Sequence, residues 1–131
     1  MLMPREISRA CELLRAASQR REVTTDMVSG VVTHHILRDS GKQRDLSHGL
    51  VSGGVAREWW SVHPDDPQSA RARAHWTEET ERGDIRIRTE TFSEMWSDAT
   101  HFHVSGRLEA YENDRLVLER AVSDSIARDH M

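Results

Sequence analysis

Two histidines near the end of the chain are the first residues that could do chemistry. His101 and His103 are two positions apart, so their imidazoles point to the same side of a β-strand. Asp98 lies close by, and imidazole and carboxylate groups ligate zinc and iron. No second H-x-H or H-x-x-E pair completes a ligand set, and any polar strand face produces the same spacing. A metal-dependent enzyme at His101 and His103 is therefore one alternative, whereas the sequence as a whole predicts no cofactor.

The sequence does not contain a recognisable nucleophile motif. The segment GLVSG at residues 49–53 has its serine out of frame for G-x-S-x-G. Cys11 lies among apolar residues and is typical of a small core side chain. Neighbouring carboxylates such as Asp65 and Asp66 point to opposite sides of a strand and cannot share one substrate. We therefore predict no catalytic residue.

Four tryptophans are candidates for binding. Trp59 and Trp60 are adjacent on a predicted strand, so they should face opposite ways, one buried and the other covering an edge or meeting a partner. Trp59 or Trp60, together with Trp76 and Trp96, could instead line the cavity of a β-barrel that binds a small hydrophobic ligand. This barrel is a second alternative.

A helix is predicted before the strands. Pro4 suits the first turn of a helix, and an apolar side chain recurs every three or four residues after it. This pattern predicts a helix over residues 4–19, packed on a sheet or mediating dimerisation. The recurring residues are Ile7, Ala10, Cys11, Leu14 and Ala17.

β-branched and alternating residues predict antiparallel strands over residues 21–122. We expect strands at 23–25, 31–38 and 55–62, turns at 26–30 and 39–42, and an irregular strand or loop at 43–53. Residues 123–131 are expected to be a surface tail. The predicted fold is mainly β, an antiparallel meander or partly closed barrel with one N-terminal α-helix, in a single domain spanning residues 1–131.

Three turns are predicted from their residues. Asp65, Asp66 and Pro67 belong to a proline-bounded turn in which Asp66 or Ser69 should bond turn amides. Gly83 and Asp84 mark a second turn, and Asn113 can take the left-handed conformation that a third turn needs.

The registers of two hairpins follow from pairing the charges and the apolar residues. A two-residue loop at Arg82-Gly83 sets Glu79 opposite Arg86 and His75 opposite Glu90. The other face of this hairpin then carries Ala70, Ala72, Ala74 and Trp76, which predicts a closely packed inner face.

The last hairpin is predicted to have a three-residue loop. A loop over residues 112–114 sets Leu108 opposite Leu118 and Val104 opposite Val122. A two-residue loop would set Leu108 opposite Glu119 and mix polar with apolar residues on both faces.

Composition limits the class of protein. A chain of 131 residues suits one domain, and its formal charge of −4 lacks the basic excess of a nucleic-acid binder. The one cysteine fits a reducing compartment, and no apolar run has the length of a membrane span. We expect a cytoplasmic protein that binds neither nucleic acid nor membrane.

Two segments resemble a known family. HPDDPQSARARAHWTEETERGDIRIRTET (residues 63–91) and SDATHFHVSGRLEAYENDRLVLER (residues 97–120) resemble the extreme C-terminal portion of CocE/NonD-type hydrolases, the X-Pro dipeptidyl-peptidase (S15-like) group. One branch of that family ends in a pattern close to DDPLSARAE…W…RGDW.VRTET…DATHFH…LEAYEGD. The chain departs from this pattern at Gln68, Ile85, Asn113 and, near its end, Ala127.

The resemblance implies a role without catalysis. Members of the family are serine hydrolases whose Ser, Asp and His lie in an α/β-hydrolase domain ahead of the matched region, so no catalytic residue carries over to this chain. We therefore predict a non-catalytic accessory module that packs against a hydrolase body or self-associates.

Overall fold

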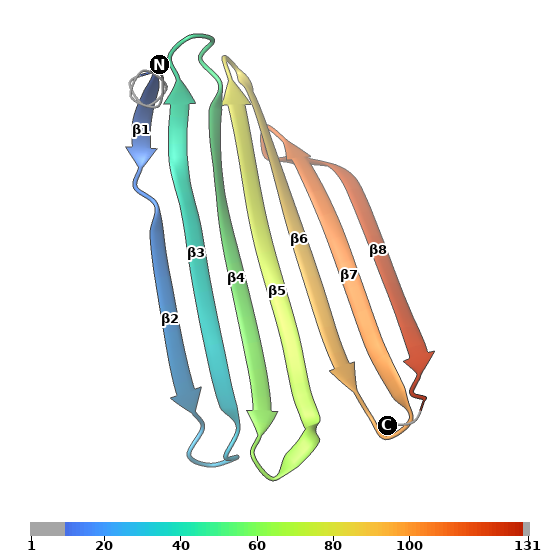
Figure 1. Ribbon diagram of the computed structural model, residues 1–131. Helices are drawn as coiled ribbons and strands as arrows, with labels where there is room; N and C mark the ends of the chain where they lie inside the picture. Colours follow the sequence, from blue (N-terminus) through green and yellow to red (C-terminus); the bar gives the residue numbers. More distant parts are fainter. Residues whose placement is uncertain (1–9, 130–131) are drawn as a thin grey trace, which may run out of the picture.

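Residues 10–129, which the computed structural model describes, form one sheet of eight antiparallel strands (Figure 1). β1 and β2 lie end to end along one edge of β3, and from β3 to β8 each strand pairs with the next in sequence. No helix in this part of the chain is long and apolar enough to cross a membrane. The strands are β1 (Cys11–Arg15), β2 (Ser18–Thr25), β3 (Val32–Asp45), β4 (Val51–His63), β5 (Asp66–Arg82), β6 (Ile85–Ser97), β7 (His101–Glu112) and β8 (Arg115–Ala127).

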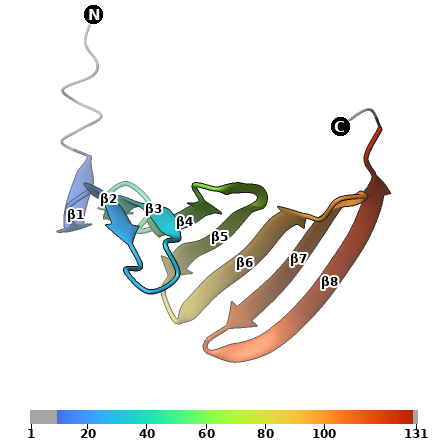
Figure 2. The same ribbon diagram turned by 90° about the horizontal axis from the view of Figure 1, so that it is seen from below.

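The sheet is open. Figure 2 shows the described residues as one curved layer, with β1 and β2 at one edge, β8 at the other, and no second layer on either face. The mainly β antiparallel meander is confirmed, whereas the partly closed barrel is wrong. A closed barrel requires hydrogen bonds between the two edges of the sheet, and over the described residues β8 pairs with β7 alone.

The helix predicted over residues 4–19 is wrong for residues 10–19, which form β1 and the start of β2. Cys11 pairs with Asp45, and Ser18 pairs with Asp39. The edge of the 14-residue β3 offers backbone groups that need hydrogen-bond partners, and pairing with them overrides the helical spacing of the side chains. Residues 4–9 of the predicted helix lie outside the described part.

A bulge replaces the turn predicted at residues 39–42. These residues lie inside β3, where the pairing with β4 shifts between Asp39 and Gly41. Gly41 has a φ of 84°, which glycine adopts without steric cost, so the chain absorbs an extra residue and continues as a strand. The predicted irregular segment at 43–53 is strand to Asp45, then a turn, and strand again from Val51.

The central hairpin turns at Gly83 and Asp84, as the sequence predicts. Gly83 has a φ of 60°, which suits the first central position of a type II′ turn. The predicted register is wrong, because Glu79 pairs with Arg88 and His75 with Phe92. The offset is two residues, so every side chain stays on its predicted face.

The last hairpin also keeps its faces while its pairing changes. Its turn is the two-residue Asn113-Asp114, with φ values of 48° and 68°, as a type I′ turn requires. The pairing then shifts, so that Leu118 lies opposite Ala110 and Val117 has no partner in β7. The predicted three-residue loop and the Leu108–Leu118 pair are therefore wrong. A bulge at Val117 restores the alternation that a two-residue loop alone would spoil.

The turn before β5 matches its prediction. The Asp66 Oδ1 atom accepts a hydrogen bond from the Gln68 amide at 3.0 Å. Ser69 Oγ accepts one from the His63 amide at 2.7 Å and donates to the Asp66 carbonyl at 2.6 Å. At the other end of the chain, the surface tail predicted for residues 123–131 is wrong for residues 123–127, which extend β8.

The two faces of the sheet differ in chemistry, as the alternation of side chains predicts. We call one of them the apolar face and the other the polar face. Along β5, Ala70, Ala72, Ala74 and Trp76 lie on the apolar face, and Arg71, Arg73, His75 and Thr77 lie on the polar face.

The described part of the chain has almost no core. Within residues 10–129, Ile36 and Val51 are the only buried apolar side chains, at 8% and 4% exposure. The inner face predicted for the central hairpin is therefore correctly grouped but is not covered. Large exposed side chains of the apolar face are Val23, Trp60, Val62, Trp76, Ile85, Ile87, Met95, Leu118, Val122 and Ile126.

Candidate functional site

A groove runs over the apolar face at β5. In the register of the sheet, Ala72 lies directly between Trp60 of β4 and Met95 of β6. The alanine side chain is short and those of Trp60 and Met95 are long. The alanines of β5 therefore form the floor of the groove, and Trp60 and Met95 form its walls. This groove has a volume of about 480 Å³. Its apolar lining includes Val32, Trp60, Val62, Ala70, Ala72, Met95 and Phe102.

The groove is suited to bind apolar side chains of another protein. Trp60 and Met95 are each 48% exposed, although nothing about their chemistry favours contact with water. The one polar atom of the Trp60 ring donates a hydrogen bond to Glu58 Oε1 at 3.3 Å, so covering the ring need not leave that donor unpaired. A contiguous exposed apolar surface of this kind marks an interaction site.

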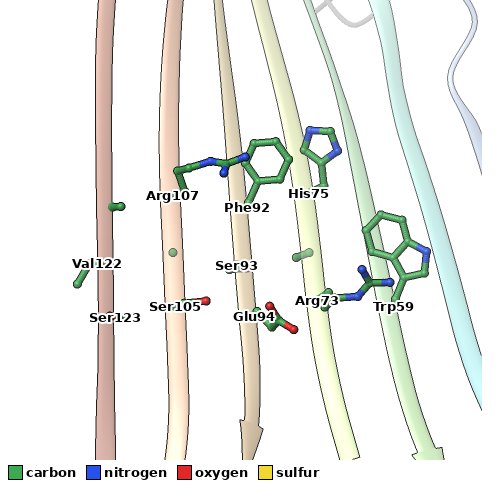
Figure 3. A pocket seen from close by; sticks show the side chains of 13 residues that line it. Trp59, Arg73, His75, Phe92, Ser93, Glu94, Ser105, Arg107, Val122 and Ser123 are labelled. Carbon is green, nitrogen blue, oxygen red and sulfur yellow. The ribbon is translucent and has the colours of Figure 1, made fainter.

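The polar face holds its aromatic rings in rows across the strands (Figure 3). Trp59 stacks on His35 with ring centroids 5.1 Å apart, and the Arg73 guanidinium lies 5.1 Å from the Trp59 ring. Phe92 lies in the same way between His75, at 4.4 Å, and Arg107, at 4.5 Å. Each ring is thus covered by a cation and an imidazole, which keeps it half-buried without a second layer.

These rows border a shallow depression of about 610 Å³ on the polar face. Of the charged side chains that line it, Arg107 pairs with Glu109 at 3.2 Å, Glu94 pairs with Arg71, and Arg73 lies over the Trp59 ring. The imidazole of His75 lies 3.2 Å from Glu90. Farther along the face, Lys42 contacts Glu81 at 3.0 Å and Glu79 at 3.3 Å. The depression is therefore a polar surface whose charged side chains interact mainly with one another.

The pKa of Lys42 is raised above its ordinary value. The hydrogen bond to Glu81 is the main cause and the bond to Glu79 adds to it, because both carboxylates favour the charged ammonium. The lysine is therefore a fixed cation that ties β3 to β5 across β4.

Asp98, His103 and Ser125 form a hydrogen-bonded chain that the sequence analysis did not anticipate. Asp98 Oδ2 lies 2.8 Å from His103 Nε2, and His103 Nδ1 lies 2.8 Å from Ser125 Oγ. These contacts have the order of a Ser–His–Asp triad. The pairing of His103 with Ser125 in β7 and β8 creates the cluster, and only the correct hairpin register would have revealed it.

Within the described part of the chain, the serine of this cluster is not placed as the nucleophile of a hydrolase. Acyl transfer needs backbone donors aimed at the developing oxyanion, and the Ser125 amide already donates to Asp124 Oδ1 at 2.8 Å. Ser125 lies in an extended edge strand and does not sit on a strand-to-helix turn.

Asp98 has a structural task instead. Its Oδ1 atom accepts hydrogen bonds from the amides of Thr100 and His101, both at 2.8 Å, and so closes the turn between β6 and β7. The bond from His103 and these two amides hold the pKa of Asp98 well below its ordinary value.

The histidines predicted as metal ligands do not make a metal centre. Their rings stack with centroids 6.1 Å apart, and both nitrogens of His103 are bonded to protein side chains. Over residues 10–129, no group of three His, Cys, Asp or Glu side chains is placed to hold an ion. The geometry thus gives the metal-dependent alternative no ligand set.

The four tryptophans are divided between the two faces. Trp59 and Trp96 lie on the polar face, whereas Trp60 and Trp76 lie on the apolar face. The prediction that Trp59 and Trp60 face opposite ways is confirmed, with Trp59 half-buried and Trp60 exposed. They cannot line one cavity, and an open sheet has no interior for a ligand, so the ligand-binding barrel receives no support.

The chain matches no protein-family model, no curated protein and no solved structure at a significant level.

Proposed function

We propose that this chain is a non-catalytic β-module that packs its apolar face against the body of a serine hydrolase of the CocE/NonD type. The observation that carries the proposal is the uncovered apolar face, centred on the groove between Trp60 and Met95. The resemblance of residues 63–91 and 97–120 to the C-terminal portion of those hydrolases supports the choice of partner.

The form of the groove supports a protein partner. A floor of alanines between a tryptophan and a methionine can receive a ridge of side chains from a helix or strand. Burying apolar surface contributes roughly 25 cal/mol per Å², so covering this face would supply stability that the single layer lacks. Methionine adapts its shape to the surface that covers it.

The lack of a complete active site supports a non-catalytic role. In the described residues, the backbone amide of Ser125 is already bonded to Asp124 and Asp98 closes the turn between β6 and β7. Hydrolysis would then belong to the partner.

A complementation experiment tests the proposal. A purified CocE/NonD-type hydrolase shortened by its own matching C-terminal segment is mixed with this chain, and light scattering after size exclusion measures the mass. We expect a one-to-one complex and a raised Tm of the shortened hydrolase. Ala72→Glu should abolish the complex by placing a charge in the groove. Ser105→Glu adds the same charge to the polar face and should bind normally. Failure to form a complex, or equal binding by both variants, would contradict the proposal.

An esterase assay tests the absence of catalysis. The purified chain is offered p-nitrophenyl acetate at neutral pH beside its Ser125→Ala variant. We expect the two proteins to give the same rate as buffer with an inert protein. Turnover by the parent chain that the Ser125→Ala variant loses would instead show that the Asp98–His103–Ser125 cluster is a working triad.

The predicted cytoplasmic location belongs to the same proposal. Its support is Cys11, the only cysteine, which is a free thiol.

A further inference from the structure

β8 is a long edge strand that is protected only by charged side chains, among them Arg120 and Asp124 on the apolar face, and by one bulge. It pairs only with β7, and all 13 of its residues are exposed. It has no proline or glycine, and its one bulge lies at Val117, next to the turn. A long regular edge is a template for another strand, and here, among the described residues, the Ser125 amide is the one backbone donor of β8 that is bonded to a side chain, at 2.8 Å from Asp124 Oδ1.

We propose that two copies of this chain associate through their β8 strands, antiparallel and centred on Val122, into one continuous sheet. The two copies are related by a twofold axis perpendicular to the sheet. This axis keeps the apolar faces of both copies on one side of the continuous sheet and the polar faces on the other. The pairing segment is bounded by the bulge at Val117 and by the strand end at Ala127, and Val122 is its midpoint.

The side chains in this register complement one another. Across the twofold axis, Leu118 lies opposite Ile126 of the second copy, and Val122 lies opposite itself. Arg120 lies opposite Asp124 of the second copy, and the symmetry makes this pair twice. Within residues 10–129, neither Arg120 nor Asp124 makes an ion pair in one copy.

Neighbouring registers lose this match. Moving the centre to Ala121 sets Leu118 against Asp124, and moving it to Ser123 sets Arg120 against Ile126. A centre at Arg120 places the arginines of the two copies directly opposite each other. Cross-strand pairs of opposite charge stabilise a sheet and like charges directly opposite destabilise it, so the sequence of β8 selects the centre at Val122.

The opposite edge of the sheet is a poor competitor. β1 and β2 are separate strands broken at residues 16–17, and β2 carries Arg20 and Arg21 side by side. An edge that is interrupted and locally basic does not offer the regular, self-complementary ladder that β8 does.

The mass of the assembly and charge reversal test the proposal. Sedimentation of the purified chain should give twice the 15.0 kDa of one copy. Arg120→Asp and Asp124→Arg should each shift the protein to the monomer at the same concentration, and the double variant should restore the dimer. Arg82→Asp makes the same charge change at the exposed end of β5 and should remain dimeric. A monomeric parent chain, filaments, or dimers that survive both single reversals would overturn the proposal.

Cross-linking tests the register separately. In a Cys11→Ser background, Val122→Cys should cross-link to its own copy with a short thiol-specific reagent. Glu119→Cys should not, because six residues along a strand place the two thiols about 20 Å apart. Efficient cross-linking at residue 119 would contradict the register. The edge is distinct from the groove, so these results do not depend on whether a hydrolase binds the apolar face.

Discussion

At the scale of single residues, Asp98 shows how one carboxylate can hold a turn of the sheet. It accepts from the amides of Thr100 and His101 and contacts the imidazole of His103, all at 2.8 Å. A carboxylate that accepts several hydrogen bonds prefers to stay charged, which lowers its pKa. The folded state is therefore linked to the ionisation of this one side chain.

Asp98→Asn is expected to lower the Tm at pH 7 by a few degrees. Because the pKa of Asp98 is lower in the folded than in the unfolded chain, its contribution is present above the ordinary value of 3.8 and is lost as the pH falls below it. The Tm difference between the parent chain and the variant should therefore shrink from pH 7 to pH 3, as measured by differential scanning fluorimetry.

Asp65→Asn is the matched control, because its carboxylate lies in an exposed turn. It should change the Tm little at either pH. A difference for Asp98→Asn that stays constant over this range would show that the carboxylate is not ionised differently in the two states.

At the scale of elements, Gly41 allows the segment that joins β1 to β2 to pack closely against β3. A Cβ atom on Gly41 would lie 2.7 Å from the carbonyl oxygen of Arg15 and 3.0 Å from the amide nitrogen of Ala17. The chain between β1 and β2 therefore passes directly over the bulge. Gly49 has a similar φ, 78°, but a Cβ atom there would meet nothing within 4 Å.

Gly41→Ala should destabilise the protein more than Gly49→Ala. Both variants carry the cost of a left-handed alanine, roughly 1–2 kcal/mol, and Gly41→Ala adds a backbone clash of about 1–3 kcal/mol. Urea unfolding followed by tryptophan fluorescence measures both free energies. Equal losses would mean that the segment between β1 and β2 does not sit on Gly41.

The turn at Asn113-Asp114 leaves room for stabilisation. Asp114 has a φ of 68°, which glycine adopts at no steric cost, and its ion pair with Arg86 is exposed. Asp114→Gly should therefore raise the free energy of unfolding by about 0.5 kcal/mol. Asp84→Gly is the matched control, because Asp84 has no positive φ and gains nothing. Stabilisation of both variants to the same degree in urea unfolding would contradict this explanation.

The sequence was sufficient to assign faces but not partners. The alternation in β5 and β7 placed each side chain on its correct face, since one face is apolar. Both hairpin registers were wrong by two residues, a shift that keeps every side chain on the same face and therefore cannot be detected from the alternation alone. The bulges at Gly41 and Val117 leave no signal in a pattern of polar and apolar residues. The helical spacing of the apolar residues in 4–19 could not reveal that residues 11–15 and 18–19 pair with the edge of β3.

The same limit applies to the candidate site. The alanines of β5 and the opposite orientation of Trp59 and Trp60 were predictable, because both depend on alternation alone. The groove between Trp60 and Met95 depends on residues of three strands being in register, and so does the chain from Asp98 to Ser125. Contacts between residues of different strands can be predicted only when the register of the strands is known.

At the scale of the whole molecule, the sheet is a single layer in which only Ile36 and Val51 of the described residues are buried apolar side chains. Stability then comes from strand pairing and from the cross-strand rows of the polar face. Strands with two neighbours are held on both sides, whereas β1, β2 and β8 are held on one. Protection of the backbone should fall from the centre to the edges.

Hydrogen exchange measured by mass spectrometry should show this gradient. At low protein concentration we expect amides of β4 and β5 to exchange most slowly and those of β2 and β8 fastest. At high concentration the amides of residues 118–126 should gain protection if β8 pairs with a second copy, while those of β2 should not. Uniform protection across all strands would indicate one cooperative unit in place of a graded sheet.

The order of the strands has a further consequence for how such a protein can change over evolutionary time. From β2 to β8, every hydrogen-bonded neighbour in space is also the next strand in sequence. A ribbon of this kind resembles a linear repeat, in which each unit depends only on the units beside it. Duplication or loss of a terminal hairpin would leave the remaining ladders unbroken, so insertions and deletions of whole hairpins should be tolerated at the β8 end.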